Sequence, residues 1–389
     1  MVEAREALAH ATGEGDPPAA SAAAWRDGAP VFEDARGADP AGAAVTAASV
    51  FDVASVSKVL ATTSAVAVLV ARGAVRLDDP VARWLPAFGG RDAVTPRSLL
   101  AHASGLPAWR PFFAEVMEAP DTAAVFEPDG RPDDATWDRA RRRVLDALFA
   151  TPLETPGRRV YSDLGFVALG ALVEAASGAR LDDFCREVLW APLGLDLGYV
   201  DLRRGTGWLE GRHVLPTGRT RPREPAPGQA HLYAVPAQPA RLDAGRVDDD
   251  NAFAMGGVAG HAGVFATAGA VARFGGMLLE EREGANRLGC GEVLRRFLAI
   301  APADGPPRGL GFDVPTGPRS GAGTRLGDGP LGAFGHLGFT GCSLWLDLDR
   351  RLSVALLTNR TLEGRHRVEG IRALRPVFHD ALLDALAPR

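Results

Sequence analysis

Apolar and polar positions divide the chain into segments with helical and with extended periodicity. Residues 2–11 predict a short amphipathic helix, and residues 21–35 alternate weakly around a turn at Asp27-Gly28, which predicts a hairpin. Residues 51–72 are apolar on nearly all sides and end at Gly73, as a helix buried in the centre of a molecule does. The first part of the chain therefore predicts a hairpin followed by a core helix.

The middle of the chain is expected to be mostly helical. Turn signals and helical stretches fill residues 77–163, with helices predicted near 96–101 and 135–149. A second strongly apolar helix is predicted over residues 164–176. Residues 203–248 are rich in Arg, Pro and Gly with little periodicity, and a loop of this length is usually functional or mobile. We expect it to rim or cover a functional site.

The last third of the chain predicts one helix, three strands and a closing helix. The helix covers residues 268–282, the strand-like runs are 310–314, 342–348 and 352–358, and the final amphipathic helix covers 368–386.

Strands at both chain ends around a helical middle predict an α+β fold, with an antiparallel sheet flanked by helices. In this interpretation residues 1–75 together with 265–389 form a sheet domain, and residues 76–264 form an inserted, mostly helical domain.

Composition narrows the class of protein. The chain has 389 residues, 46% apolar and 23% charged, which is ordinary for a globular protein. A net charge of −5 argues against a nucleic-acid partner. No apolar run is long enough for a membrane span, and the N-terminus lacks the pattern of a signal peptide, so a cytoplasmic protein is expected. The sequence leaves the oligomeric state open.

The cysteines and histidines indicate no metal and no cofactor. Three cysteines at wide spacings form no metal-type pairing and no disulfide framework, and the eight histidines show no ligand spacing. We expect His102 and His261 to be structural.

Lys58 stands out because it is the only lysine in the sequence, beside 42 arginines. Arginine keeps its proton in proteins, whereas a desolvated lysine can act as a base near neutral pH. Ser55 lies three residues earlier, so on a helix the hydroxyl and the amine share a face and can contact each other. A leftover lysine in a biased composition is the alternative explanation.

Two further tripeptides carry candidate chemistry. Tyr161-Ser162-Asp163 supplies a phenol that can relay a proton taken from a serine. Taken alone, the tripeptide is better explained as a core tyrosine followed by a helix-capping Ser-Asp pair. His336-Leu337-Gly338 precedes a predicted strand, where a glycine lets the backbone approach a substrate. A lone histidine, however, is usually just a polar surface or core residue.

The order S-x-x-K, Y-S-D, H-x-G resembles that of the serine β-lactamase and penicillin-binding-protein superfamily. The likeness is greatest to class C β-lactamases, family VIII carboxylesterases and muropeptide amidases. Further segments that look like this family are Arg76-Leu77-Asp78-Asp79-Pro80, Leu99 to Pro107 and Gly256 to Gly263.

The resemblance implies a β-lactamase/transpeptidase-like fold and a role for each motif residue. Ser55 would be the acylated nucleophile, Lys58 and Tyr161 would share the general-base and acid roles, and His336 would stand where a lysine or histidine usually does. The backbone N–H groups of Ser55 and Phe339 would form the oxyanion hole beside Gly338.

Two positions depart from the β-lactamase pattern. Asp163 stands where those enzymes have an asparagine, and an ionised carboxylate cannot donate to the acyl carbonyl of a substrate. His336 replaces a lysine that grips the carboxylate of β-lactams, and a free histidine is mostly neutral at pH 7. Weak or absent β-lactamase activity is therefore expected.

The sequence thus predicts a serine hydrolase that acts on a small-molecule ester through an acyl-enzyme. An amidase acting on muropeptides or other amides is the alternative enzyme. A catalytically silent homologue that binds ligands in the same cleft is the alternative from another class.

Overall fold

The computed structural model describes residues 1–127, 130, 132–205, 207–226, 228–235, 241–317 and 320–387. Its α-helices are α1 (Val2–Gly13), α2 (Ser64–Ala71), α3 (Pro96–Leu100), α4 (Phe112–Glu118), α5 (Asp134–Ala150), α6 (Asp163–Ser177), α7 (Leu181–Cys185), α8 (Asp250–Ala254), α9 (Ala268–Arg282), α10 (Gly291–Phe297) and α11 (Glu369–Leu386). Its strands are β1 (Ala19–Arg26), β2 (Ala29–Gly37), β3 (Phe51–Asp52), β4 (Leu197–Tyr199), β5 (Val264–Ala266), β6 (Ala333–Leu337), β7 (Ser343–Asp347) and β8 (Leu352–Thr358).

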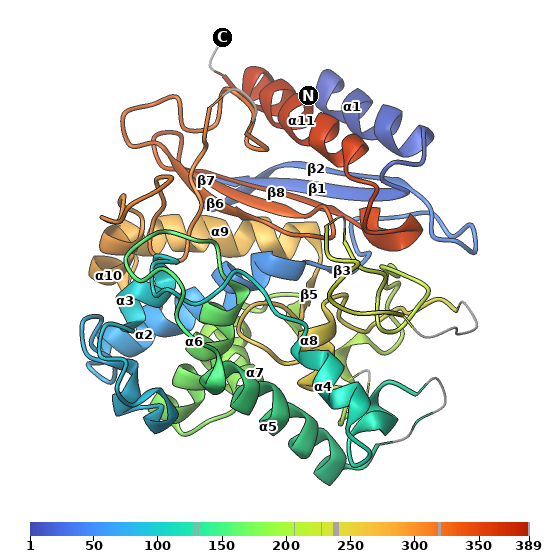
Figure 1. The fold of residues 1–389 in the computed structure, drawn as a ribbon. Helices are drawn as coiled ribbons and strands as arrows, with labels where there is room; N and C mark the ends of the chain where they lie inside the picture. The colour runs from blue at the N-terminus through green and yellow to red at the C-terminus, as the bar shows by residue number, and fades with distance from the viewer. Residues whose placement is uncertain are drawn as a thin grey trace.

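A five-stranded antiparallel sheet joins the two ends of the chain. Its strand order is β2-β1-β8-β7-β6, so that β1 pairs with β8 although more than 300 residues separate them. Helices α1 and α11 cover one face, and α9 covers the other (Figure 1). Apolar side chains fill the space on both faces of the sheet. The sheet is therefore the middle layer of a helix–sheet–helix arrangement.

The remaining helices lie beyond α9 and surround a second, smaller sheet. This sheet has the order β3-β5-β4, and β3 is only two residues long. Figure 1 shows α2, α6 and α5 on the side of α9 away from the five-stranded sheet. Strand β3 ends at Asp52, three residues before Ser55, so the small sheet anchors the chain just ahead of that serine.

The fold is α+β with an antiparallel sheet flanked by helices, as the sequence predicts. The hairpin, the helices near 2–11, 135–149, 164–176 and 268–282, the two late strands and the closing helix are confirmed. The division into a sheet domain and an inserted helical domain stays a prediction.

Two predicted elements differ in the structure. The buried helix predicted over residues 51–72 is confirmed from Ala54 to Ala71, but β3 occupies its first two residues, and the helical segment is irregular, with a 3₁₀ turn at Ala54–Val56, a π-helix at Lys58–Thr63 and then α2. The strand predicted at 310–314 makes only isolated bridges, such as Asp313 to Gly335. Gly311 has φ +80°, which interrupts an extended strand despite the alternating apolar residues around it.

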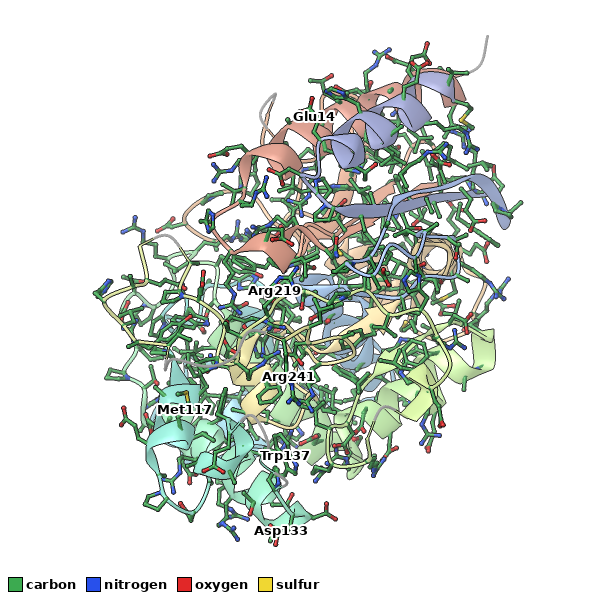
Figure 2. The ribbon with its side chains drawn as sticks, turned by 90° about the vertical axis from the view of Figure 1, so that its right-hand side faces the viewer. Glu14, Met117, Asp133, Trp137, Arg219 and Arg241 are labelled. Carbon is green, nitrogen blue, oxygen red and sulfur yellow. The ribbon has the colours of Figure 1, made fainter. Side chains whose placement is uncertain are left out.

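The long loop predicted over residues 203–248 is largely irregular in its described part, apart from a 3₁₀ turn at Gly207–Leu209. Figure 2 shows Glu14 and Asp133 at opposite ends of the molecule, with Arg219 and Arg241 of this loop between them. The amide of Arg241 donates to the carbonyl of Arg219 at 3.0 Å, so the loop folds back on itself. Residues 206, 227 and 236–240 of the predicted loop lie outside the described residues.

The segment Ala54–Ala71 is long and apolar enough to pass a membrane-span test, with a mean hydropathy of 1.7. Because 83% of it is buried inside the fold, it serves here as a core segment. A second candidate arises only if α6 and the helical run from Leu181 to Leu193 count as one span despite a 76° bend.

Gly275 of α9 is expected to be intolerant of substitution because the helix lies directly on the sheet. A Cβ at this position would overlap Ser353 Oγ and crowd Leu346 Cδ2 at 2.7 Å. We expect Gly275→Ala to lower the free energy of unfolding by about 1–3 kcal/mol, measured by urea denaturation. The control is Gly269→Ala on the same helix, whose Cβ would meet only the end of the Glu33 side chain at 3.3 Å. An equal or higher urea midpoint for Gly275→Ala would contradict this close packing.

Candidate active site

Ser55 and Lys58 lie where an irregular helical segment begins. Ser55 belongs to the 3₁₀ turn Ala54–Val56, and Lys58 opens the π-helix Lys58–Thr63, whose i→i+5 hydrogen bonds give a wider turn than an α-helix. π-Helical turns are rare and are frequently found at functional sites. The lysine Nζ lies 2.8 Å from Ser55 Oγ, so the contact expected from a regular helix forms on an irregular one.

Lys58 is completely buried and uses all three of its N–H donors. Besides Ser55 Oγ, its Nζ lies 2.7 Å from Asp163 Oδ1 and 3.2 Å from the backbone carbonyl of His261. An ammonium group has three protons, and here each one meets an acceptor. The contacts therefore match the charged form of the lysine.

The electrostatic surroundings of Lys58 also favour its charged form. Burial by itself lowers the pKa of Lys58, but the Asp163 carboxylate and Tyr161 outweigh it and raise that pKa above its ordinary value. Sequence reasoning placed Asp163 against the substrate and did not anticipate that it is the counter-ion of Lys58. The two residues are 105 positions apart, and nothing in the local pattern indicates the pairing.

Tyr161 lies two residues before the start of α6, beside the His102 ring. Ser162 caps α6 by accepting from the amide of Gly165, and its own amide donates to Nδ1 of His102 at 3.0 Å. The His102 ring lies 4.7 Å from the Tyr161 ring, centroid to centroid. Burial raises the pKa of Tyr161, while the charge of Lys58 and hydrogen bonds to Lys58 and Ser55 oppose part of that rise.

The two histidines expected to be structural both support the site. Burial holds the pKa of His102 well below its usual value, so it is a neutral acceptor beside Tyr161. His261 presents its carbonyl to Lys58, and its Nε2 lies 2.9 Å from Asp249 Oδ1. The preceding Gly260 makes this position reachable, because its amide and Cα lie so close to α6 that a Cβ would overlap the carbonyl of Phe166.

His336 lies on β6 with only 1% of its surface exposed. Its Nδ1 is 2.8 Å from the carbonyl of Leu337, which can only accept, so Nδ1 carries the proton. Burial and the nearby Lys58 charge lower its pKa well below the usual value, so the ring is neutral at pH 7. The ring centroid lies 5.8 Å from that of Tyr161. His336 therefore adjoins the Ser55 cluster without a charge of its own.

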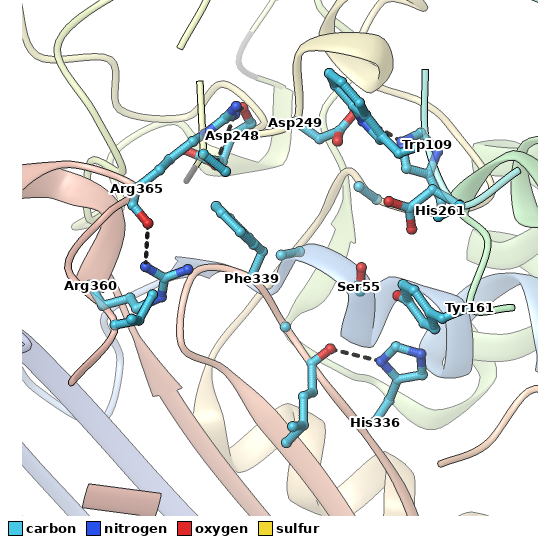
Figure 3. A pocket seen from close by; sticks show the side chains of 18 of the residues that line it. Ser55, Trp109, Tyr161, Asp248, Asp249, His261, His336, Phe339, Arg360 and Arg365 are labelled. Atoms are coloured by element: carbon cyan, nitrogen blue, oxygen red, sulfur yellow. Dashed lines mark hydrogen bonds and ion pairs between the residues drawn. The ribbon is translucent and has the colours of Figure 1, made fainter. Parts of the chain in front are cut away.

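A pocket of about 510 Å³ opens over Ser55, and all the other predicted site residues except the fully buried Lys58 line it as well. Figure 3 shows Ser55 between Tyr161 and Phe339, with His336 below. Gly338 and Phe339 follow β6, and Phe339 is 41% exposed at the pocket wall. Neither the amide of Ser55 nor that of Phe339 donates to another described protein group. Both amides are thus available to a ligand.

The pocket contains a hydroxyl contacted by a buried cation, a buried phenol and two available amides. These groups suit nucleophilic attack on a carbonyl and stabilisation of the oxyanion that forms. Within the described ranges no group of three His, Cys, Asp or Glu side chains is arranged to hold a metal ion.

Comparison with known proteins shows which family the sequence belongs to. The family described as Beta-lactamase matches residues 4–377. A putative D-alanyl-D-alanine carboxypeptidase of Escherichia coli K12 is 28% identical over 332 residues, which is 81% of this chain and 70% of the relative. An N-acetylmuramyl-L-alanine amidase of Bacillus subtilis strain 168 is 28% identical over 324 residues, 80% of this chain and 68% of the relative.

Solved structures share the fold at lower sequence identity. The D-amino acid amidase of Ochrobactrum anthropi SV3, complexed with L-phenylalanine, superposes with a TM-score of 0.69 at 18% identity and covers 99% of both chains. An octameric penicillin-binding protein homologue from Pyrococcus abyssi gives a TM-score of 0.67 at 19% identity, covering 97% of this chain and 75% of that one. Since the family match extends over nearly the whole sequence, the chain belongs to the Beta-lactamase family and has the fold of its serine hydrolases.

Proposed function

We propose that the chain hydrolyses a small ester through an acyl-enzyme on Ser55. The contact between Lys58 Nζ and Ser55 Oγ at 2.8 Å, inside a pocket, is the observation that carries this proposal. Ser55 Oγ attacks the carbonyl carbon, and the alcohol leaves with a proton from the Lys58–Tyr161 pair. Water then releases the acyl group.

The amides of Ser55 and Phe339 are the proposed oxyanion hole. A tetrahedral intermediate places negative charge on the former carbonyl oxygen, and backbone N–H groups aimed at that oxygen stabilise it most when water is excluded. Both residues line the same pocket, and neither amide has another described protein partner, which supports the assignment.

Lys58 rests as an ammonium ion, so its base role depends on pH. The neutral amine that can accept the serine proton becomes more populated as pH rises toward the raised pKa of Lys58. Tyr161 lies beside both groups and would pass the proton between serine and leaving group. We infer that the Asp163 carboxylate sets how much of this amine is available.

An amide substrate with an anionic group is the second candidate, and the charges in the pocket favour it. Every acidic side chain in the described pocket wall is paired with a lysine, arginine or histidine side chain. The pairs are Asp163 with Lys58, Asp249 with His261, Asp248 and Asp250 with Arg365, and Asp313 with Arg308. The wall nevertheless keeps positive charge, because Arg360 and Arg375 donate only to backbone carbonyls in the described structure.

The positive charge of Arg360 and Arg375 in the pocket wall would attract a substrate carboxylate. Figure 3 shows Arg360 beyond Phe339 as seen from Ser55, and the Arg360 guanidinium lies 4.5 Å from the centroid of the Phe339 ring. The relatives named as a D-alanyl-D-alanine carboxypeptidase and an N-acetylmuramyl-L-alanine amidase act on bonds of the amide class, which supports the same candidate. His336 is neutral and would not supply this charge.

Replacing the nucleophile tests the enzyme proposal against a silent homologue. Ser55→Ala removes the hydroxyl, so p-nitrophenyl butyrate hydrolysis should fall by roughly 10³-fold or more, and labelling by a fluorophosphonate probe should disappear. Ser177→Ala, at the far end of α6, is the control and should match the wild type. Equal labelling and turnover in the wild type and Ser55→Ala would reject the proposal.

Removing the counter-ion tests the role of Asp163. In Asp163→Asn the carboxylate that raises the pKa of Lys58 is gone, so that pKa should fall and the alkaline rise in labelling rate should move to lower pH. At pH 8 we expect labelling at least about threefold faster than in the wild type. The measurement is the rate of fluorophosphonate labelling between pH 7 and 10.5. An unmoved profile would show that Lys58 does not limit the reaction through its proton.

Removing the charge of Arg360 distinguishes anionic from neutral substrates. Arg360→Gln should raise KM about tenfold for the mono-p-nitrophenyl ester of glutaric acid, which carries a free carboxylate. The neutral p-nitrophenyl butyrate is the matched control, and its KM should change less than about twofold. Equal changes in KM for both esters would mean that Arg360 does not recognise an anionic group.

A further inference from the structure

A buried carboxyl group, Asp52, lies three residues before Ser55 at the end of β3. It is completely buried, and both of its oxygens accept hydrogen bonds from backbone amides. Oδ1 lies 2.8 Å from the amide of Ala54, and Oδ2 lies 2.5 Å from the amide of Asp248. Among the described residues no arginine, lysine or histidine forms an ion pair with it. Because this buried carboxyl has no cationic partner, its role is expected to lie in the two backbone amides that it holds.

The first of these amides belongs to a strained residue. Ala54 has φ +48°, in the left-handed region that an L-residue with a Cβ adopts rarely. It directly precedes Ser55 and lines the pocket. Backbone strain at such a position persists only when the surroundings hold it in place. The bond from the Ala54 amide to Asp52 closes a short side-chain turn that does so, and this turn sets the direction in which Ser55 leaves β3.

The second amide links Asp52 to the wall of the pocket. Asp248 and Asp249 both line the pocket. The Asp249 carboxylate contacts Nε2 of His261 at 2.9 Å, and the His261 carbonyl accepts from Lys58. The segment Asp248–Asp249 is therefore connected to the Ser55 turn through Asp52 and to Lys58 through His261.

We propose that Asp52 is a positioning residue for the nucleophile: its carboxylate holds the Ala54–Ser55 turn and the Asp248–Asp249 wall in register, and protonation of that carboxylate loosens one of them. This proposal rests on the proposed function only in taking Ser55 as the nucleophile. An ionised carboxylate accepts strongly from both amides, whereas the hydroxyl oxygen of a protonated carboxyl is a poorer acceptor, so one of the two segments is held less firmly.

The surroundings of Asp52 put this change near neutral pH. Burial, helped by the neighbouring charges of Asp248 and Asp249, raises the pKa of Asp52 to about 7 against the opposing effect of its two amide donors. A further titratable group beside Asp52 is Cys342, whose Sγ lies 3.5 Å from the Asp52 backbone carbonyl, and burial raises the pKa of that thiol to about 11. Cys342 therefore stays neutral across the range in which Asp52 titrates, and activity should fall as pH drops below about 7.

Asp52→Asn tests the proposal because the amide is nearly isosteric but cannot accept from both backbone amides. We expect kcat for p-nitrophenyl butyrate to fall about 10- to 100-fold per active site, with KM within about twofold. Protonation of Lys58 lowers kcat with falling pH in both proteins; the additional, steeper fall of the wild type below about pH 7, here called the acidic limb, should disappear in Asp52→Asn. Active sites are counted by fluorophosphonate labelling, so loss of folded protein is not mistaken for loss of rate. The exposed Asp92→Asn is the control and should keep both the rate and the limb.

The outcomes separate this proposal from the proposed function. If the wild type neither labels nor hydrolyses esters, the function of Ser55 is rejected. If the wild type is active and Asp52→Asn keeps the wild-type kcat per active site, or keeps the acidic limb, the positioning role is rejected while the function stands. Should Asp52→Asn fail to accumulate, Asp52→Glu keeps the carboxylate but displaces it. A lower kcat with a retained limb then supports the proposal, and an unchanged kcat rejects it.

Discussion

The ion pair between Lys58 and Asp163 is the interaction on which the rest of the site depends. Lys58 is completely buried, and an unpaired charge in such a place would be destabilising by several kcal/mol. Asp163 is the first residue of α6, where the helix dipole favours a negative charge. The start of α6 and the π-helical turn at Lys58 must therefore stay within hydrogen-bonding distance. The same Lys58 Nζ contacts Ser55 Oγ, so the ion pair also fixes the position of the serine hydroxyl.

Much of the fold follows from periodicity in the sequence. The early hairpin, the long amphipathic helix at the C-terminus and the two late strands are local patterns, and each is found close to its expected limits. Ser55, Tyr161 and His336 line one pocket, and only the resemblance to a known family predicted that these three distant segments would meet. Residue chemistry alone left each of them open to a structural explanation.

What the sequence could not predict depends on contacts between distant segments or on backbone geometry. The pairing of Asp163 with Lys58, of Asp249 with His261 and of Asp52 with the Asp248 amide joins residues far apart in the chain. The apolar character of residues 51–72 is compatible with a regular helix, and only tertiary constraints turn its first part into a strand and a strained 3₁₀ turn. At 310–314 the apolar alternation is genuine, but glycine conformation prevails over it.

The pairing of β1 with β8 has a consequence for the order in which the protein is made. Strand β1 is complete at residue 26, yet its central partner is not synthesised until residues 352–358. On the ribosome the hairpin β1–β2 must wait with one edge uncovered, and such an edge invites association with other chains. Phe339, Arg360 and Arg375 also emerge late, so the nascent chain carries its serine and lysine long before the pocket around them is closed. Biosynthesis thus keeps the hydrolytic site incomplete until the segment that carries Arg375 has been made.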